Sequence, residues 1–274
     1  MLTISSLQVT TLKSLDQFVT KLNLMFSLKD LGPLHSFLGV QVHRSENGLN
    51  LSQPGYITDL LHRANMIDCK ESHSPASSST QLGSTVGNSF PDTFLYQSTV
   101  GALQYFTITR PEISFIVNKL SQSMHNPTDV YWSACKRMLC YLHGTKHLGL
   151  LIRPSRRLTL SGFTDADWAS NLDDRKSISG YCIYLGTTLV SWSSRKQNVV
   201  ARSSTEAEYR ALALGAAEIS WLQQLFMELN FSLPSIPILW CDNMGAECLA
   251  ANHVFHNRTK YIEVDVHFVR DKVL

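Results

Sequence analysis

The chain has 274 residues, of which 44% are hydrophobic and 17% are charged, as in an ordinary globular protein with a sizeable core. Its 24 basic and 22 acidic side chains leave a formal net charge of +2, which excludes bulk charge as a reason to expect nucleic-acid binding. Any such contact must come from local patches. The six cysteines form no CxxC pair, and no apolar run reaches the ~18 residues of a membrane span, so we expect reduced thiols, no membrane partner and an intracellular protein.

The N-terminal part of the chain predicts short strands and helices. Residues 1–5 favour a strand, and Ser14 is placed as a helix N-cap, with Gln17 positioned to close a capping box. Strands at 37–42 and 49–52 flank an Asn-Gly pair, which is typical of a hairpin turn. These signals predict a small antiparallel unit that follows an amphipathic helix.

Residues 72–92 contain many serines and two prolines, which predicts a solvated connector that is too polar to pack. Helical periodicity stands on both sides of it. The predicted helices begin at Ser52 or Gln53 and continue through Leu61, and then cover about 94–108, 111–124 and 127–143. We expect the apolar faces of the last three to pack as core. Those faces carry Val100, Leu103, Phe106, Ile113, Ile116, Leu120, Trp132, Met138 and Leu142.

From residue 150 the pattern changes to strands followed by helices. Strands are predicted at 158–163, 181–185, 188–192 and 236–241, and helices at about 204–229, 243–251 and 258–272. Three consecutive strands, a long helix, a fourth strand and further helices indicate a mixed sheet with helical cover. We therefore divide the chain into 1–150 and 151–274.

Three acidic residues stand at similar points of these elements. Asp165 follows the first strand of the second part, Glu208 lies near the start of the long helix, and Asp242 follows the fourth strand. Carboxylates from two strand ends and one helix can converge on divalent cations, which is the pattern of a two-metal nuclease. Clustered carboxylates repel one another, so at least one should have a raised pKa. The alternative is three unrelated surface acids.

Neighbouring acids compete for these roles. Asp167 would share a strand face with Asp165 if the strand continues. Glu206 is two positions from Glu208 and cannot share its helix face, so we expect it to support the helix N-terminus. Asp173 and Asp174 fall in an expected loop and are predicted to be turn residues.

Basic residues flank the third strand of the second part and the long helix. Arg195, Lys196 and Arg202 are candidates for contacts with nucleic-acid phosphates. An ordinary solvated face is the alternative interpretation. Trp192 and Trp240 lie in predicted strands and are expected to be core residues and not stacking platforms.

A series of motifs extends along nearly the whole chain. They include Phe-Ser-Leu-Lys-Asp-Leu-Gly at 26–32, Thr-Arg-Pro-Glu-Ile-Ser at 109–114, Ser-Trp-Ser-Ser-Arg-Lys-Gln at 191–197, Ser-Ser-Thr-Glu-Ala-Glu-Tyr at 203–209 and Cys-Asp-Asn at 241–243. In this order and spacing the chain resembles the C-terminal part of the polyprotein of copia-type LTR retrotransposons, where reverse transcriptase runs into ribonuclease H. Each motif alone is weak, but the ordered series is specific.

The resemblance implies an α/β (α+β) fold in two parts. Residues 1–150 would be a reverse transcriptase remnant, comprising the end of the palm with thumb-like and connecting helices. Residues 151–274 would be a ribonuclease H-like mixed sheet with helices. The implied activity is hydrolysis of the RNA strand of RNA–DNA hybrids, which leaves 5′-phosphate and 3′-hydroxyl ends. The implied partners are the hybrid and the remainder of the polyprotein.

The resemblance also assigns the site. Two Mg²⁺ ions, for which Mn²⁺ can substitute, would be held by Asp165, Glu208 and Asp242, with Asp165 bridging both. It favours Asp165 over Asp167 and Glu208 over Glu206.

Both ends of the family pattern are expected to lie outside the chain. The polymerase aspartates would precede Met1, so polymerase activity is not expected from these residues, although the chain could be part of an active polymerase. A last strand and a helix with a fourth carboxylate would follow Leu274, and Glu263 and Asp265 match the helix before it. A non-catalytic nucleic-acid-binding or degenerate fragment is therefore the alternative to a ribonuclease.

Overall fold

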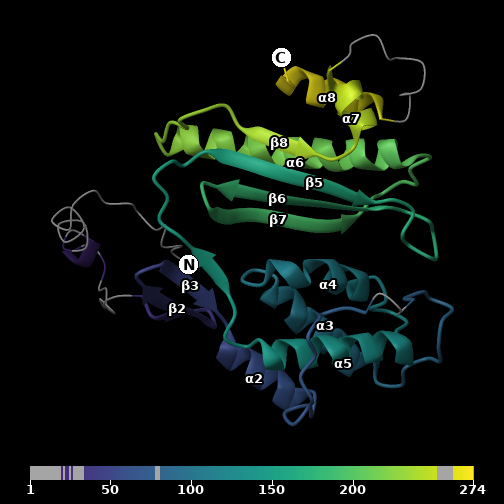
Figure 1. Cartoon of the computed structure of the whole chain (residues 1–274). Coiled ribbons are helices and arrows are strands. Elements are labelled where there is room, and N and C mark those ends of the chain that lie inside the picture. The colour runs from purple at the N-terminus through teal and green to yellow at the C-terminus, as the bar shows by residue number, and fades with distance from the viewer. Residues whose placement is uncertain are drawn as a thin grey trace.

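The computed structural model describes residues 20, 22–24, 26, 34–77, 81–251 and 262–273, and places them in two four-stranded sheets with helices (Figure 1). The predicted strand at 1–5 and the capping pair Ser14 and Gln17 lie outside the described residues. Of the helix predicted to follow them, residues 20 and 22–24 are described and are helical. None of the described helices is both long enough and apolar enough to cross a membrane.

The first sheet is antiparallel and has the order β1-β2-β3-β4. Its strands are β1 (Ser36–Phe37), β2 (Val40–Ser45), β3 (Gly48–Ser52) and β4 (Leu150–Ile152). The predicted hairpin is confirmed, since Ser45 pairs with Gly48. Gly48 has a φ of 128°, and a Cβ there would lie 2.1 Å from the Ile152 carbonyl oxygen, so glycine permits the approach of β4. The first sheet thus extends past residue 150, and the chain changes sheet between β4 and residue 160.

Helices α2 (Pro54–Arg63), α3 (Thr93–Phe106), α4 (Ser114–Ser121) and α5 (Asp129–Gly144) form the core of the first part, together with the 3₁₀ turn η1 (Pro111–Ile113). The predicted helices are confirmed, and Pro111 opens the 3₁₀ turn because its ring fixes φ and its missing N–H is not needed there. Every predicted apolar face residue is buried except Trp132, which is partly buried against the same core.

The prediction that the connector is too polar to pack is wrong. Ala76, Leu82 and Phe90 pack against the helical core, and the Phe90 ring stacks on Trp132 with centroids 5.0 Å apart. The Phe90 backbone N–H also donates to the Pro127 carbonyl at 2.9 Å. A few apolar side chains, spaced along a serine-rich segment, are sufficient to attach it to the helices.

The second sheet has the order β7-β6-β5-β8 and is mixed, because β8 runs parallel to β5 while the other neighbours are antiparallel. Its strands are β5 (Leu160–Asp167), β6 (Ile178–Leu185), β7 (Thr188–Lys196) and β8 (Ile238–Cys241). The helix α6 (Ser204–Glu228) lies along one face, and α7 (Met244–Ala251) and α8 (Glu263–Val273) pack near its N-terminal half (Figure 1). The predicted mixed sheet with helical cover is therefore confirmed.

A glycine lets α6 lie close to β5, because a Cβ at Gly215 of α6 would be 2.5 Å from Cγ2 of Thr164. In β5 itself, a Cβ at Gly162 would be 2.8 Å from Cδ1 of Leu239 in the neighbouring strand β8. The helix begins at a defined point, because the Ser203 side chain accepts a hydrogen bond from the Glu206 N–H at 3.1 Å. Glu208 is thereby placed one turn into the helix, over the end of β5.

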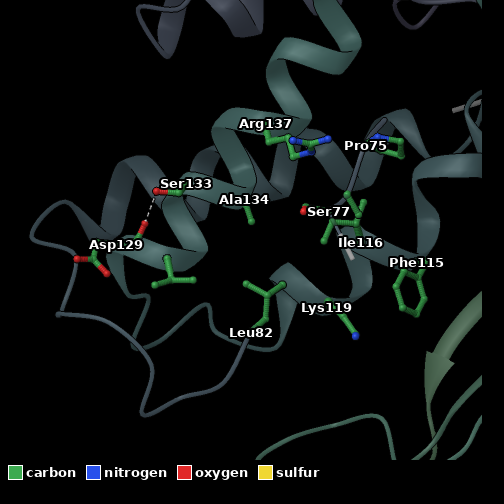
Figure 2. A pocket seen from close by; sticks show the side chains of 12 residues that line it. Pro75, Ser77, Leu82, Phe115, Ile116, Lys119, Asp129, Ser133, Ala134 and Arg137 are labelled. Carbon is green, nitrogen blue, oxygen red and sulfur yellow. Dashed lines mark hydrogen bonds between the residues drawn. The ribbon is translucent and has the colours of Figure 1, made fainter. Parts of the chain in front are cut away.

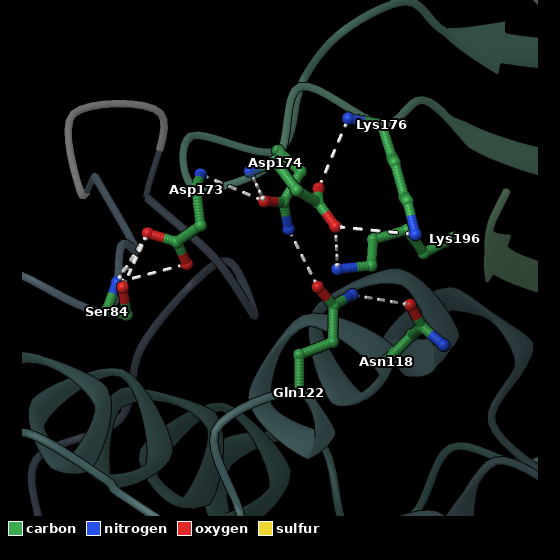
Figure 3. Close-up of polar contacts among 8 residues, drawn as sticks. Ser84, Asn118, Gln122, Asp173, Asp174, Lys176 and Lys196 are labelled. Carbon is green, nitrogen blue, oxygen red and sulfur yellow. Dashed lines mark hydrogen bonds and ion pairs between the residues drawn. The ribbon is translucent and has the colours of Figure 1, made fainter. Parts of the chain in front are cut away.

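Polar contacts join the two parts of the chain. The loop between β5 and β6 reaches the connector, where the Asp173 carboxylate accepts bonds from the Ser84 N–H and hydroxyl, both at 2.8 Å (Figure 3). The Asn171 side-chain amide donates to Gln122 Oε1 at 2.8 Å, at the end of α4. Trp192 packs on the same side, and its indole N–H donates to the Thr107 carbonyl at 3.0 Å.

Candidate metal site

The three predicted acids come from the expected elements. Asp165 lies in β5, whose alternating pattern leaves Asp165 exposed and buries its neighbours Thr164 and Ala166. Asp242 follows β8 directly, and the parallel register pairs Thr164 with Cys241. Asp165 and Asp242 are each the next residue along, so they lie at the same end of the two strands. Glu208 approaches this edge from α6.

The structure brings two of the three carboxylates into one group. One ligand atom each from Glu208, Cys241 and Asp242 lies within 4.8 Å of the others, which is the one such group of potential metal ligands among the described residues. Asp165 lies outside this group, but its charge still raises the pKa of Glu208.

Glu208 is a buried acid with an unusual environment. Its side chain is 7% exposed, and its Oε2 atom has no hydrogen-bond partner. Burial raises the pKa of Glu208 to about 7, the charges of Asp165 and Asp242 add to that rise, and a hydrogen bond with the Ala166 backbone opposes it. The expectation that one clustered carboxylate has a raised pKa is confirmed, and Glu208 is that residue.

Cys241 is the member of the group that the sequence analysis missed. It is the last residue of β8, half-buried, and lies on the sheet face that packs against α6. Burial raises the pKa of its thiol, and the nearby charges of Glu208 and Asp242 act in the same direction. Hydrogen bonds with the Asn243 backbone and the Thr164 side chain oppose the rise. The available signal was strand alternation, which places Leu239 and Cys241 on one face.

Comparisons with known proteins identify relatives of this chain. The family described as "Reverse transcriptase (RNA-dependent DNA polymerase)" matches residues 2–78. The Retrovirus-related Pol polyprotein from transposon RE2 of Arabidopsis thaliana is 47% identical over 248 residues, which cover 90% of this chain and 17% of that protein. The Pol polyprotein from transposon TNT 1-94 of Nicotiana tabacum is 36% identical over 259 residues, covering 90% of this chain and 19% of that protein. The chain belongs to the copia-type retrotransposon Pol polyproteins.

Other relatives are shorter. An uncharacterized mitochondrial protein of Arabidopsis thaliana is 45% identical over 208 residues, which cover 76% of this Pol segment and 86% of that protein. The Pol segment spans less than a fifth of the length of the transposon polyproteins RE2 and TNT 1-94. No solved structure was found to match it.

The competing acids of the Pol segment have other partners or positions. Asp167 is exposed on the same strand face as Asp165, because β5 continues to it. Glu206 accepts a bond from the Arg202 N–H at 2.8 Å and pairs with Arg210 at 3.0 Å, which confirms its role at the helix N-terminus. In α8, Asp265 lies 3.9 Å from Arg210, and burial raises the pKa of Asp265 although that arginine opposes the rise.

The predicted turn residues Asp173 and Asp174 do lie in the loop between β5 and β6, and both are bonded there. Asp174 pairs with Lys196 at 3.0 Å and with Lys176 at 3.7 Å (Figure 3). Burial works to raise the pKa of Asp174, but the two lysines lower it overall. The ammonium of Lys196 therefore holds this loop against β7.

The other two predicted phosphate-binding residues are exposed. Arg195 lies near the end of β7, and Arg202 precedes the first turn of α6. Arg195 is in register with Ser179, which pairs with Ala166, so Arg195 lies at the same end of the sheet as the Ala166 backbone that Glu208 contacts. Their contact with nucleic acid remains a prediction, as does that of Lys196.

A cavity of about 620 Å³ opens elsewhere in the Pol segment, between the connector and helices α4 and α5 (Figure 2). Its lining includes Leu82, Ile116, Lys119 and Arg137, and none of the three predicted carboxylates. It belongs to the helical part and has no share in the candidate metal site.

Proposed function

We propose that residues 151–274 of this Pol segment form a ribonuclease H-like domain that hydrolyses the RNA strand of RNA–DNA hybrids. The observation that carries the proposal is Glu208. A carboxylate that is 7% exposed, has an unpartnered oxygen and lies near two other acids is costly unless a cation compensates it. Such a residue favours a catalytic role over a structural one.

The arrangement of the sheet supports the same function. Three antiparallel strands, a long helix over their face and a fourth strand parallel to the first form a scaffold that groups Glu208 of α6 with Asp242 after β8, while Asp165 of β5 lies outside this group. A rigid scaffold of strands and a helix holds ligands more accurately than loops do.

The donor set fits magnesium. Asp165, Glu208 and Asp242 offer hard carboxylate oxygens, and Mg²⁺ needs only a few of these because it keeps several waters. Bound Mg²⁺ ions would supply an activated water and stabilise the leaving oxygen. Glu208 must be deprotonated to bind a metal ion. Asp165 and Asp242 are exposed, so their carboxylates are accessible to a substrate.

Arg195 and Arg202 would contact the phosphates of the hybrid beside this edge. Recognition would depend on helix shape and 2′-hydroxyl groups and not on base sequence. The match of residues 2–78 to reverse transcriptase supports a polyprotein in which polymerase and nuclease act on the same nucleic acid.

One observation favours a second candidate, a non-catalytic nucleic-acid-binding segment. The group of ligand atoms within 4.8 Å contains only two carboxylates and a thiol, with Asp165 outside it. A site with this composition could bind a hybrid without cleaving it.

The deciding experiment is cleavage of a labelled RNA–DNA hybrid by the purified chain with Mg²⁺ or with EDTA. We expect cleavage in Mg²⁺ only, and its loss in Asp165→Asn. Asp167→Asn is the matched control, since it removes the neighbouring charge on the same strand face and should retain activity. Hybrid binding by the folded chain without any cleavage would establish the second candidate instead.

A further inference from the structure

The ligand group at the edge of the second sheet contains a thiol. Cys241 contributes Sγ, and Glu208 and Asp242 each contribute a carboxylate oxygen, all within 4.8 Å of one another. Among the described residues, the other five cysteines belong to no such group. Magnesium does not use a sulfur ligand, so the group carries a donor for which the proposed nuclease has no need.

A second observation indicates that this group binds a ligand. Glu208 is more than nine-tenths buried, its Oε2 atom has no hydrogen-bond partner, and the same residue belongs to the ligand group. Its position is fixed by α6 and by the hydrogen bond with the Ala166 backbone. Glu208 thus carries a buried oxygen that no group of the described chain satisfies, and the same carboxyl group belongs to the cluster with Cys241 and Asp242.

The donor chemistry selects the cation. A thiolate with two carboxylates suits Zn²⁺ or Cd²⁺, which accept sulfur and oxygen together and leave a fourth position for water. In a tetrahedral zinc site, neighbouring ligand atoms lie roughly 3.3–3.8 Å apart, given metal–ligand distances of about 2.0–2.3 Å. The three ligand atoms lie within 4.8 Å of one another, so binding draws them closer together, and Asp242 can supply this movement because it is exposed and follows the end of β8.

We propose that Glu208, Cys241 and Asp242 form a binding site for a thiophilic divalent cation, Zn²⁺ or Cd²⁺, whose occupancy excludes Mg²⁺ from the same carboxylates. As the cation binds, the sulfur–metal bond forms, the S–H bond breaks and the thiol proton passes to the buffer. The exclusion follows because two of the three donors are shared. The exclusion of Mg²⁺ rests on the magnesium site of the proposed function, whereas binding of the thiophilic cation rests on the ligand group alone and does not require hydrolysis.

The test is a Cd²⁺ titration of the full chain, which follows the ultraviolet charge-transfer absorption of cadmium–thiolate bonds. Wild type should show one more cadmium–thiolate equivalent than Cys241→Ser. Cys248→Ser is the matched control, because Cys248 is exposed and belongs to no ligand group, and it should retain that equivalent. Equal absorption in wild type and folded Cys241→Ser would overturn the proposal.

Two further arms keep the test decisive. Glu208→Gln leaves every thiol in place and should weaken binding of Cd²⁺ at Cys241 by at least about tenfold, since losing a ligand costs no less than losing an outer partner. Added Mg²⁺ should weaken Cd²⁺ binding in wild type in proportion to its concentration. Unchanged Cd²⁺ affinity in both arms would refute the shared site. None of these experiments measures hydrolysis, so the Cd²⁺ result can be interpreted even if the chain has no nuclease activity.

Discussion

Arg110 in the helical part and Glu208 in the second part are both buried, and their surroundings compensate their charges in opposite ways. Arg110, in the helical part, is 2% exposed and fully bonded: Nε contacts Glu112 at 2.6 Å, and the two terminal nitrogens donate to the Thr145 carbonyl and hydroxyl at 3.1 and 2.8 Å. Its guanidinium also lies over the Tyr141 ring. Glu208, in the second part, keeps an oxygen without a partner.

The difference separates a structural charge from a functional one. Arg110 satisfies the end of α5, where Thr145 is the C-cap, and it lies against one continuous apolar core. Glu208 lies where the second part divides into smaller apolar clusters, and its burial is not compensated by the chain. Strongly perturbed acids of this kind collect at binding and catalytic sites.

Replacing Arg110 should have the largest effect on stability. Arg110→Met removes three hydrogen bonds and leaves the Thr145 groups poorly satisfied, so we expect a loss of about 3–4 kcal/mol in the free energy of unfolding. The measurement is urea unfolding. Arg156→Ala removes an exposed arginine and should change stability by no more than about 0.5 kcal/mol. A loss below about 1 kcal/mol for Arg110→Met would show that its bonds contribute little.

Replacing Glu208 should raise the free energy of unfolding, which is opposite in sign to the effect of replacing Arg110. The folded pKa of about 7 exceeds the unfolded value of 4.5, so the folded state binds the proton more tightly and loses stability as the pH rises through this window. Without metal at pH 8, Glu208→Gln should therefore stabilise the chain by up to roughly 3 kcal/mol. Near pH 4 the gain should vanish, because wild-type Glu208 is then protonated in both states.

Urea unfolding in EDTA at the two pH values checks this prediction. Glu206→Gln is a matched control in the same helical turn, and it should lose up to about 1 kcal/mol because Glu206 supports the helix N-terminus and pairs with Arg210. A gain for Glu208→Gln that is independent of pH would be falsifying evidence, since the cost of Glu208 is assigned to its charged form.

The contrast between the two parts also shows what the sequence could predict. Helical and strand periodicity predicted the buried faces of α3, α4 and α5 and the succession of strands and helices along the second part, because these depend on local pattern. The three acids were identified by their positions and by the resemblance. Their spatial grouping depends on the pairing of β5 with β8, which joins segments far apart in the chain.

Three features escaped prediction for the same physical reason. Cys241 gains its role only from the register that pairs it with Thr164. The connector packs through isolated apolar residues, which leave no periodic pattern. The bonds between Ser84 and Asp173 join residues 89 positions apart, and neither residue is unusual in its own segment. Long-range contacts between polar residues have no local sequence signal.

Magnesium binding should depend on pH through Glu208. Binding requires the ionised carboxylate, and each pH unit below the pKa of about 7 lowers the ionised fraction about tenfold. We expect Mg²⁺ affinity to rise by up to about tenfold per pH unit from pH 5 to 7 and then to level off. Calorimetric titration at several pH values measures this. In Glu208→Gln the residual Mg²⁺ affinity should no longer depend on pH in this range. An unchanged pH profile in this variant would assign the pH dependence to another group.

The smallest expected effect concerns the contact that joins the two parts. Asp173 accepts bonds from the Ser84 N–H and hydroxyl at an exposed position, so Asp173→Ala should lower stability by only about 1 kcal/mol. A double-mutant cycle with Ser84→Ala isolates the hydroxyl bond, for which we expect a coupling energy of about 0.5 kcal/mol. If the two parts unfold together, Asp173→Ala shifts one transition. If the two parts unfold in separate transitions, Asp173→Ala changes the spacing between the two unfolding midpoints. Arg110 and Glu208 would then belong to two independent folding units.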